Sequence, residues 1–338
     1  MPRNKAAVSI RDVAAAAGVS VATVSRVLNP ASADVAMREE TRARVVRAIN
    51  ALGYRPNDLA RALLQQRTST IGLVLPDISN PYYPPLVRGV EDAASSLGYR
   101  VVLCNTDRDP DKTATYLDTL VKARVDGVVV AGGNLCELPG HLQVFETYRT
   151  KLVMVGRHGL AHPSVRVDNV AATRDATAYL VGLGHRRISF IGGPQGSSTA
   201  HDRLLGYRRA IAEARLTGFE RATDFDERGG YDATRSLLDE MLPTAVLCAN
   251  DRMAFGAYAA LADATLSVPG DVSVIGFDDV PMASFVRPTL TTVAVPTYEL
   301  GRAAMRLLQD ALDGSASTDP VLLPTRLVRR ASCTRPSR

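Results

Sequence analysis

Small and polar side chains recur at helical spacing near the start of the chain, in the segment GVSVATVSRVLN (residues 18–29). Apolar Val24, Val27 and Leu28 would occupy one face of a helix, which leaves a polar stripe on the opposite side. An arginine there can donate two parallel hydrogen bonds to a guanine edge, and small apolar side chains can contact thymine methyl groups. Hydroxyl groups at the helix start suit phosphate oxygens. We therefore predict a helix that reads DNA through Ser20, Val21, Ala22, Thr23, Ser25, Arg26 and Asn29.

Two very short helices must position this stripe. Ser9 and Asp12 have the spacing of a capping box, and Gly18 is a natural helix end. Ser20 can cap the second helix, contact a phosphate, or do both. Two helices joined by a tight turn with a glycine are typical of a helix-turn-helix.

A third helix is predicted over Glu39–Leu52, with Val45, Val46, Ile49 and Leu52 on one face and Gly53 at its end. The three apolar faces can then close one small core, so we predict an all-α headpiece over residues 1–55. Residues 56–69 form a hinge and linker, in which DLARALLQQ is long enough for only about two helical turns. Such a short helix is marginal in water, so we expect it to need a partner.

Charge is distributed unevenly along the chain. Residues 1–67 contain eleven Lys or Arg and five Asp or Glu, a net charge of +6, whereas the whole chain carries +5 and the remainder therefore −1. A basic segment joined to a nearly neutral one is the electrostatic pattern of a nucleic-acid-binding module attached to a second domain.

From residue 70 onward, apolar strands alternate with amphipathic helices. Runs such as IGLVLPD, VDGVVVAGG and VSVIGFDD are typical of parallel strands that are buried on both faces. The pattern predicts a doubly wound α/β core with two lobes and a ligand cleft at the strand ends. We expect a first lobe over about 70–163 and 296–322 and a second over about 164–295 and 323–332.

Several functional classes find no support in the sequence. It contains no P-loop, no dinucleotide-binding glycine motif, and no zinc-protease or serine-hydrolase motif. IGGPQGSS could hold an anion but reads more simply as a turn, and His158 and His162 lie in a loop with no further ligand nearby. We expect no enzyme activity, no metal site and no cofactor. No secretory signal and no membrane-spanning run is found, so a cytoplasmic protein is expected.

Several motifs together resemble the LacI/GalR family of bacterial transcriptional regulators: DVAAAAGVSVATVSRVLN, TRARVVRAINALGYRPNDLARAL, IGLVLPDISNPYYPPLVRGVEDAA, VDGVVVAG, GHRRISFIGG, CANDRMAFGAY, VSVIGFDD and LTTV. The resemblance runs from about Ser9 to Arg330. It implies a homodimer that binds a palindromic operator, most often as a repressor. It also implies a hinge helix that folds on the operator and inserts Leu63 into the minor groove, with small Ala60 where two hinge helices approach.

The same resemblance implies a core like that of the periplasmic sugar-binding proteins, with a sugar or nucleoside between the lobes. The matching effector-binding positions are Asn80, Tyr82, Tyr83, Arg157, Arg203, Phe225, Asn250 and Asp278. Two departures remove hydrogen-bonding groups, because Gly156 stands where relatives often have an acid and Val295 where many have Gln. The loop NPASADVAMREETR is also longer than is usual.

Two other functions stay open at this point. A cytoplasmic small-molecule binding protein with vestigial helices is opposed by the basic headpiece, and steeply salt-dependent DNA binding would exclude it. An enzyme acting on a sugar or nucleoside would need a general acid near Asp278 and Asn250, and none is evident in the sequence.

Overall fold

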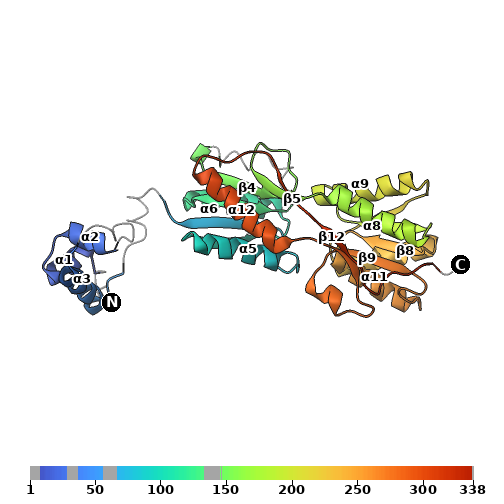
Figure 1. The fold of residues 1–338 in the computed structure, drawn as a ribbon, viewed down its shortest axis with the longest axis horizontal. Helices are drawn as coiled ribbons and strands as arrows, with labels where there is room; N and C mark the ends of the chain where they lie inside the picture. The colour runs from blue at the N-terminus through green and yellow to red at the C-terminus, as the bar shows by residue number, and fades with distance from the viewer. Residues whose placement is uncertain (1–7, 29–36, 56–66, 133–144, 146, 337–338) are drawn as a thin grey trace. The chain divides into compact units, whose positions relative to one another are not determined.

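The computed structural model describes residues 8–28, 37–55, 67–132, 145 and 147–336 (Figure 1). It divides into two compact units, residues 1–68 and residues 69–338. We refer to them as the headpiece and the core unit. The helical headpiece and the α/β core unit confirm the predicted fold class.

The headpiece is a helix-turn-helix followed by a third helix. Its helices are α1 (Ile10–Ala17), α2 (Val21–Leu28) and α3 (Glu39–Leu52). The Ser9 hydroxyl accepts from the Asp12 backbone N–H and the Asp12 carboxylate accepts from the Ser9 N–H, which confirms the capping box. Gly18 and Gly53 both adopt left-handed backbone conformations, with φ of 63° and 61°, and end α1 and α3 as predicted.

The apolar face predicted for α3 is partly wrong. Val45 is fully buried against Val13 and Val24, but Val46 is 42 % exposed and Leu52 is 37 % exposed. Ala48, three residues after Val45, takes a buried place instead, whereas Val46 is turned by about 100° from Val45 and Leu52 is the last residue of α3.

The core unit contains two six-stranded sheets, one in each lobe. The first sheet is wholly parallel in the order β11-β5-β4-β3-β1-β2, and the second has the order β12-β10-β9-β8-β6-β7 with β12 antiparallel to β10. The strands of the first sheet are β1 (Thr70–Leu75), β2 (Arg100–Asn105), β3 (Gly127–Ala131), β4 (Lys151–Val155), β5 (Ser164–Val167) and β11 (Val321–Leu323). Those of the second are β6 (Ile188–Gly192), β7 (Phe219–Ala222), β8 (Ala245–Cys248), β9 (Ser273–Asp278), β10 (Thr291–Ala294) and β12 (Arg326–Val328).

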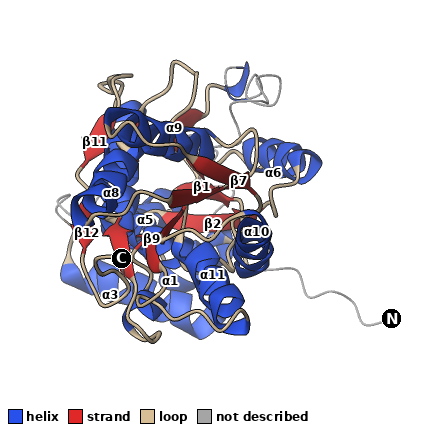
Figure 2. Cartoon of the chain, turned by 90° about the vertical axis from the view of Figure 1, so that its right-hand side faces the viewer, coloured by secondary structure: helices blue, strands red, loops and turns tan. Residues whose placement is uncertain are grey.

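Helices cover both sheets, as the apolar strands require. In Figure 1, α12 lies along α5 although the two are far apart in sequence, and in Figure 2, α10 and α11 lie side by side. Close approach of α12 to α5 needs a glycine, since a Cβ on Gly89 would lie 2.1 Å from the Tyr298 carbonyl oxygen. The helices of the core unit are α5 (Tyr83–Ser96), α6 (Pro110–Lys122), α8 (Asn169–Leu183), α9 (Ser198–Glu213), α10 (Glu227–Glu240), α11 (Asp251–Asp263) and α12 (Thr297–Leu312).

The chain passes between the lobes three times, and the first crossing comes later than predicted. β5 pairs with β4 and with β11 in the first sheet, so the first lobe extends through Val167 rather than ending near residue 163. Val165 explains this placement, because it is fully buried between the neighbouring strands. The other crossings follow β10 and β11, close to the expected positions.

Candidate functional site

Helix α2 presents the predicted polar stripe to solvent. Val24 is fully buried in the headpiece core, which turns the opposite side of the helix outward. Val21 is 41 % exposed and so is available to contact a partner. The exposed residues on this side are Ser20, Val21, Ala22, Ser25 and Arg26.

Ser20 and Thr23 are engaged with one another at the start of α2. The Ser20 Oγ accepts from the Thr23 backbone N–H at 3.2 Å, and the two hydroxyl oxygens are 2.9 Å apart. Capping is therefore a structural role of Ser20, and Thr23 is only half-exposed. Asn29, Ala60 and Leu63 lie outside the described residues, so their predicted roles stay predictions.

A cavity of about 340 Å³ opens at the carboxyl ends of the strands, between the two lobes of the core unit. This volume falls in the range of small-molecule sites, roughly 300–1,000 Å³. Seven of the eight predicted effector positions line it: Asn80, Tyr82, Tyr83, Arg203, Phe225, Asn250 and Asp278. They come from segments spread over most of the core unit, which the tertiary fold brings together.

Arg203 is the most firmly held of these residues. Its side chain is almost fully buried on α9, and its Cζ lies 3.6 Å from the centroid of the Phe277 ring. Its guanidinium donates to the Asn169 Oδ1 at 2.9 Å, to the Asp278 Oδ1 at 3.2 Å and to the Ala249 carbonyl oxygen. Planar stacking and the fork of donors fix the cation before any ligand arrives.

Asp278 carries the carboxylate that Arg203 holds. Burial raises its pKa to about 6, while the Arg203 cation opposes that rise, so the group is mainly ionised at pH 7. Its φ of 110° is rare for a residue with a side chain, and it places this carboxylate at the end of β9 beside the cavity. Asp251 lies deeper, where it accepts from Thr292 and from the Val280 backbone N–H.

The segment NPYY forms the aromatic wall of the cavity in the first lobe. The Asn80 Oδ1 accepts from the Tyr82 backbone N–H at 3.0 Å, and this bond shapes the turn before α5. The rings of Tyr82 and Tyr83 meet edge to face with centroids 5.0 Å apart. Burial raises the pKa of both phenols, so both remain neutral and can donate a hydrogen bond.

Phe225 and Asn250 build the wall of the second lobe. The Asn250 Oδ1 caps α11 by accepting from the Met253 N–H at 2.8 Å, while its Nδ2 donates to the Phe225 carbonyl at 3.2 Å. The ring of Phe225 lies against Gly193, where an added Cβ would come within 2.1 Å of it. The glycine pair of IGGPQGSS therefore makes room for an aromatic side chain.

Arg157, the eighth predicted residue, does not line the cavity. Its Nε donates to Asp202 at 2.8 Å and its carbonyl oxygen accepts from the Ser198 hydroxyl at 2.9 Å. Arg157 follows β4 of the first lobe, whereas Ser198 and Asp202 lie on α9 of the second. It therefore connects the lobes instead of facing the ligand space.

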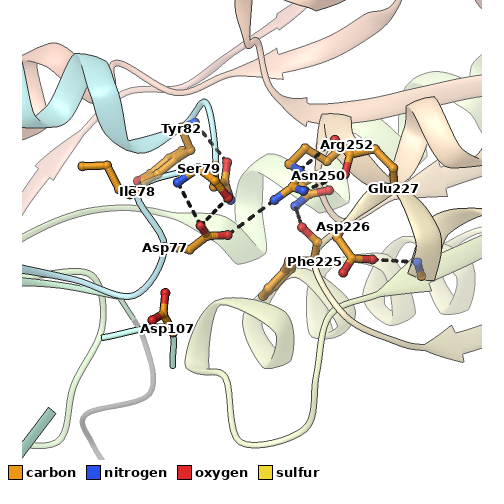
Figure 3. Close-up of polar contacts among 12 residues, drawn as sticks. Asp77, Ile78, Ser79, Tyr82, Asp107, Phe225, Asp226, Glu227, Asn250 and Arg252 are labelled. Atoms are coloured by element: carbon orange, nitrogen blue, oxygen red, sulfur yellow. Dashed lines mark hydrogen bonds and ion pairs between the residues drawn. The ribbon is translucent and has the colours of Figure 1, made fainter. Parts of the chain in front are cut away.

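A second connection between the lobes lies at the cleft, where Figure 3 shows Arg252 reaching toward Asp77. The Arg252 guanidinium is held by two hydrogen bonds to the Glu227 carboxylate, at 2.9 and 2.6 Å, and lies 3.5 Å from the Asp77 Oδ2. Asp77 follows β1 of the first lobe and accepts from Ser79 on the same turn. Arg252 and Asp77 are both partly buried, with side chains 17 % and 19 % exposed, so solvent screens this contact only partly.

Sequence reasoning missed several polar residues of the cavity. Arg166 lies in β5 between two buried valines, and an arginine inside an apolar strand is a signal that could have been used. The others are Thr106, Arg108, Thr113, Asn169, Ser197 and Thr199, which follow strands or begin helices. Of the two departures, Gly156 lines the cavity and a Cβ on it would meet no atom within 4 Å, whereas Val295 is buried and does not line it.

The part of the chain that the structure describes contains neither a cluster of metal ligands nor a helix that could span a membrane. No three His, Cys, Asp or Glu side chains among those residues gather as a metal site would require. None of the described helices is both long and apolar enough to cross a bilayer.

Comparison with known proteins gives the same division into headpiece and core unit. A family described as bacterial regulatory proteins, lacI family, matches residues 9–57, and a periplasmic binding protein-like domain matches residues 177–333. The chain is 41 % identical to the HTH-type transcriptional regulator RegA of Clostridium saccharobutylicum, over 96 % of this chain and 99 % of that one. It is 40 % identical to the ribose operon repressor of Escherichia coli K12, over 94 % and 96 %.

Solved structures agree over nearly the full length. The lac repressor dimer bound to operator and the anti-inducer ONPF superposes with a TM-score of 0.88 at 29 % identity, covering 97 % of this chain and 99 % of that one. The transcriptional regulator CelR in complex with cellobiose gives 0.74 at 34 % identity, covering 96 % and 99 %. These relatives are regulators, which confirms the expectation that the chain is not an enzyme. The chain belongs to the LacI family of bacterial transcriptional regulators, with a periplasmic-binding-protein-like core.

Proposed function

We propose that this protein is a homodimeric repressor in the cytoplasm that binds a palindromic operator, and that a sugar-like molecule in the cleft controls its affinity for the operator. The observation that carries the proposal is the cavity lined by residues of both lobes, because a molecule bound there contacts both and favours one arrangement of them. Relatives support the class of ligand and target, since one is named a ribose operon repressor and another was solved with cellobiose.

The cleft and the operator are coupled by linkage. A ligand shifts operator affinity only by its differential affinity for two arrangements of the lobes. The lobe-crossing contacts of Arg157 with Asp202 and of Arg252 with Asp77 are made in the arrangement described here. A ligand that rotates the lobes must lengthen or replace these contacts, and this cost is part of the coupling free energy.

On the DNA side, α2 enters the major groove. Arg26 reads a guanine, while Val21 and Ala22 lie against thymine methyl groups. Ser20, Thr23 and Ser25 face phosphates near the positive end of α2. Asn29 reaches a base edge from the end of the stripe. Leu63 in the hinge inserts between base pairs in the minor groove, and Ala60 allows two hinge helices to approach.

Exposed apolar side chains on the core unit support the dimer. Phe285 is 72 % exposed and Met282 is 55 % exposed on the second lobe, and on the first Leu97 and Val102 are 47 % and 44 % exposed. Exposed apolar side chains that lie together, as Met282 and Phe285 do within one turn of chain, often mark a protein–protein contact surface. Phe285→Asp should therefore give a monomer in analytical ultracentrifugation and lower operator affinity sharply.

The deciding experiment selects bound sequences from a random duplex library with the full chain at physiological salt. Enrichment of a palindrome with a central C-G step supports the dimer and the Leu63 wedge together. Leu63→Ala should then weaken specific binding far more than nonspecific binding, because only the specific complex bends the duplex. Equal losses of specific and nonspecific binding would rule out the insertion of Leu63 between base pairs. A selection with no enriched palindrome would contradict the assignment as a repressor.

A further inference from the structure

The cleft contains more positive charge than a neutral sugar needs. Among the described residues that line it there are three arginines, Arg108, Arg166 and Arg203, and one carboxylate, Asp278. Asp278 is already paired with Arg203, so two guanidinium groups remain without a counter-charge in the lining.

Arg108 and Arg166 make no hydrogen bond or ion pair with any described residue, and each is only half-exposed. Arg108 follows β2 with a φ of 59° and lies close enough to Tyr83 to lower the pKa of its phenol. Arg166 lies in β5 and similarly lowers the pKa of His158. A half-buried cation without a partner is costly, which favours an anion as its missing partner.

The acids that neighbour these arginines are committed elsewhere. Asp107 holds the Lys112 ammonium and the Asn105 amide. Asp109 caps α6, with its Oδ1 accepting from the Asp111 N–H at 2.8 Å and the Lys112 N–H at 3.1 Å. On the other side, the Asp168 Oδ1 caps α8 by accepting from the Ala171 N–H at 2.9 Å.

Gly156 removes the one further acid that the family pattern would place here. A side chain at this position would point into open space, since no atom lies within 4 Å of its Cβ. An acid there would repel an anionic ligand, whereas glycine leaves both charge and volume free for one. Thr199 and Thr106 also line the cavity, and their hydroxyl groups can bond the sugar hydroxyls.

We propose that the effector is an anionic carbohydrate, a sugar that carries a carboxylate or a phosphate, and that Arg108 and Arg166 bind its anionic group or groups. Guanidinium groups suit either anion because each can donate two parallel hydrogen bonds to it. Tyr82 and Phe225 cover the apolar face of the ring, and Asp278 accepts from its hydroxyls. The proposal rests on the proposed function, since it names the ligand class of the same cleft.

The test compares matched neutral and anionic probes by calorimetry and thermal shift with the full chain. The probes are D-glucose, D-gluconate and D-glucose 6-phosphate, then D-ribose, D-ribonate and D-ribose 5-phosphate, with inorganic phosphate alone. We expect at least one anionic probe to bind ten-fold or more tightly than its neutral partner. Tightest binding of gluconate or ribonate would identify the effector as a sugar acid, and tightest binding of a phosphorylated sugar would identify it as a sugar phosphate. If inorganic phosphate bound as tightly as the best sugar probe, the cleft would bind anions without recognising a sugar, and the proposal would be overturned.

Substitutions of the two arginines test whether their side chains bind the anionic group. Arg166→Gln and Arg108→Gln, separately and together, should weaken the winning anion ten-fold or more while leaving weak binding of the neutral partner unchanged. Arg228→Gln is the matched control, because its side chain is 81 % exposed on α10 away from the cavity. Neutral probes that bind as tightly as the anions, or losses no larger than the control, overturn the proposal. Binding to the selected operator separates the anionic-effector proposal from the proposed function. In the absence of ligand, the arginine variants should still bind the operator if the proposed function holds.

Discussion

The headpiece and the cleft differ in how they hold the side chains that meet a partner. On α2 the residues predicted to contact DNA are mostly exposed, and they are carried by one helix of eight residues. In the cleft the corresponding residues are buried, come from both lobes, and are fixed by bonds such as those of Arg203 with Asn169, Ala249 and Asp278. One surface is therefore separable from the stability of its unit, and the other is part of it.

This difference has a physical cause. A groove-reading helix needs only one buried face, so substitutions on its outer face leave the packing intact. A closed cleft removes its polar groups from water, so each must be paired whether or not a ligand is present. Arg108 and Arg166 are the exceptions among the described residues of the cleft, and for that reason they carry the ligand proposal.

The largest expected effect comes from removing the cation at the centre of the cleft. Arg203→Met leaves the Asp278 carboxylate buried without its partner, which should cost about 3 to 5 kcal/mol of the free energy of unfolding of the core unit. Chemical denaturation followed by circular dichroism measures it. Arg208→Met on the same helix is the control, because its pair with Glu220 is largely exposed and should contribute under about 1 kcal/mol. If Arg203→Met lowered the free energy of unfolding as little as the control does, the cleft residues would be as separable from the stability of their unit as those of α2.

A pH effect should follow from the same pair. Burial raises the pKa of Asp278 to about 6, whereas the unfolded chain has a value near 3.9. The folded state therefore binds this proton more tightly, and the contribution of Asp278 to stability is present below pH 4 and lost as pH rises to 6. The difference in free energy of unfolding between the natural chain and Asp278→Asn should fall by roughly 2 to 3 kcal/mol over that window. Denaturation at several pH values tests it, and a difference that rises with pH would contradict it.

On the headpiece, Arg26→Ala should act on DNA alone. Loss of a two-hydrogen-bond contact with guanine should cost about 1 to 3 kcal/mol of specific operator binding. The free energy of unfolding should change by less than about 0.5 kcal/mol, because the side chain is exposed. Fluorescence anisotropy with the selected operator and with scrambled duplex measures the first effect. Arg44→Ala on α3 removes the same charge from another exposed position, and a loss of specificity equal to that of Arg26→Ala would contradict base reading.

The smallest effect is expected at the cleft, in the lobe-crossing pair. Arg252→Gln removes its cation from Asp77 in the other lobe, and a pair at 3.5 Å that is only partly buried contributes about 0.2 to 1 kcal/mol. Because a ligand that rotates the lobes must break this contact, its removal should raise effector affinity about two- to five-fold. Asp77→Asn removes the same contact but leaves the bonds of Arg252 to Glu227 in place, so the double variant should change effector affinity by less than the sum of the two single effects. Full additivity in calorimetry would show that the pair does not act as a unit.

Local signals in the sequence predicted the headpiece well. The capping box of Ser9 and Asp12 and the left-handed Gly18 depend on neighbours within three residues, and both are present in the structure. The face of α3 was partly mispredicted, since Val46 and Leu52 are apolar but turned outward. Which of several apolar residues is buried depends on how α3 packs against α1 and α2, and periodicity alone does not decide that.

The cleft was predicted in part. Seven of the eight residues matched to family motifs line the cavity, and Arg157 does not. Arg157 lies close in sequence to Gly156, which does line the cavity, yet its side chain turns toward Asp202 in the other lobe. Arg108 was missed because a charged side chain in a loop has no distinctive spacing, whereas Arg166 carried a local signal in its position between two buried valines of β5.

The sequence by itself determined the helix-turn-helix, the basic headpiece and the alternation of strands and helices that produces two sheets. These follow from interactions between near neighbours and from hydrophobic periodicity, both of which can be read along the chain. Only the tertiary structure decided that β5 belongs to the first lobe, that Arg157 connects the lobes, and that two arginines in the cleft pair with no carboxylate among the residues the structure describes. Those facts depend on which distant segments meet, because burial and charge pairing are properties of a packed site and not of a stretch of sequence.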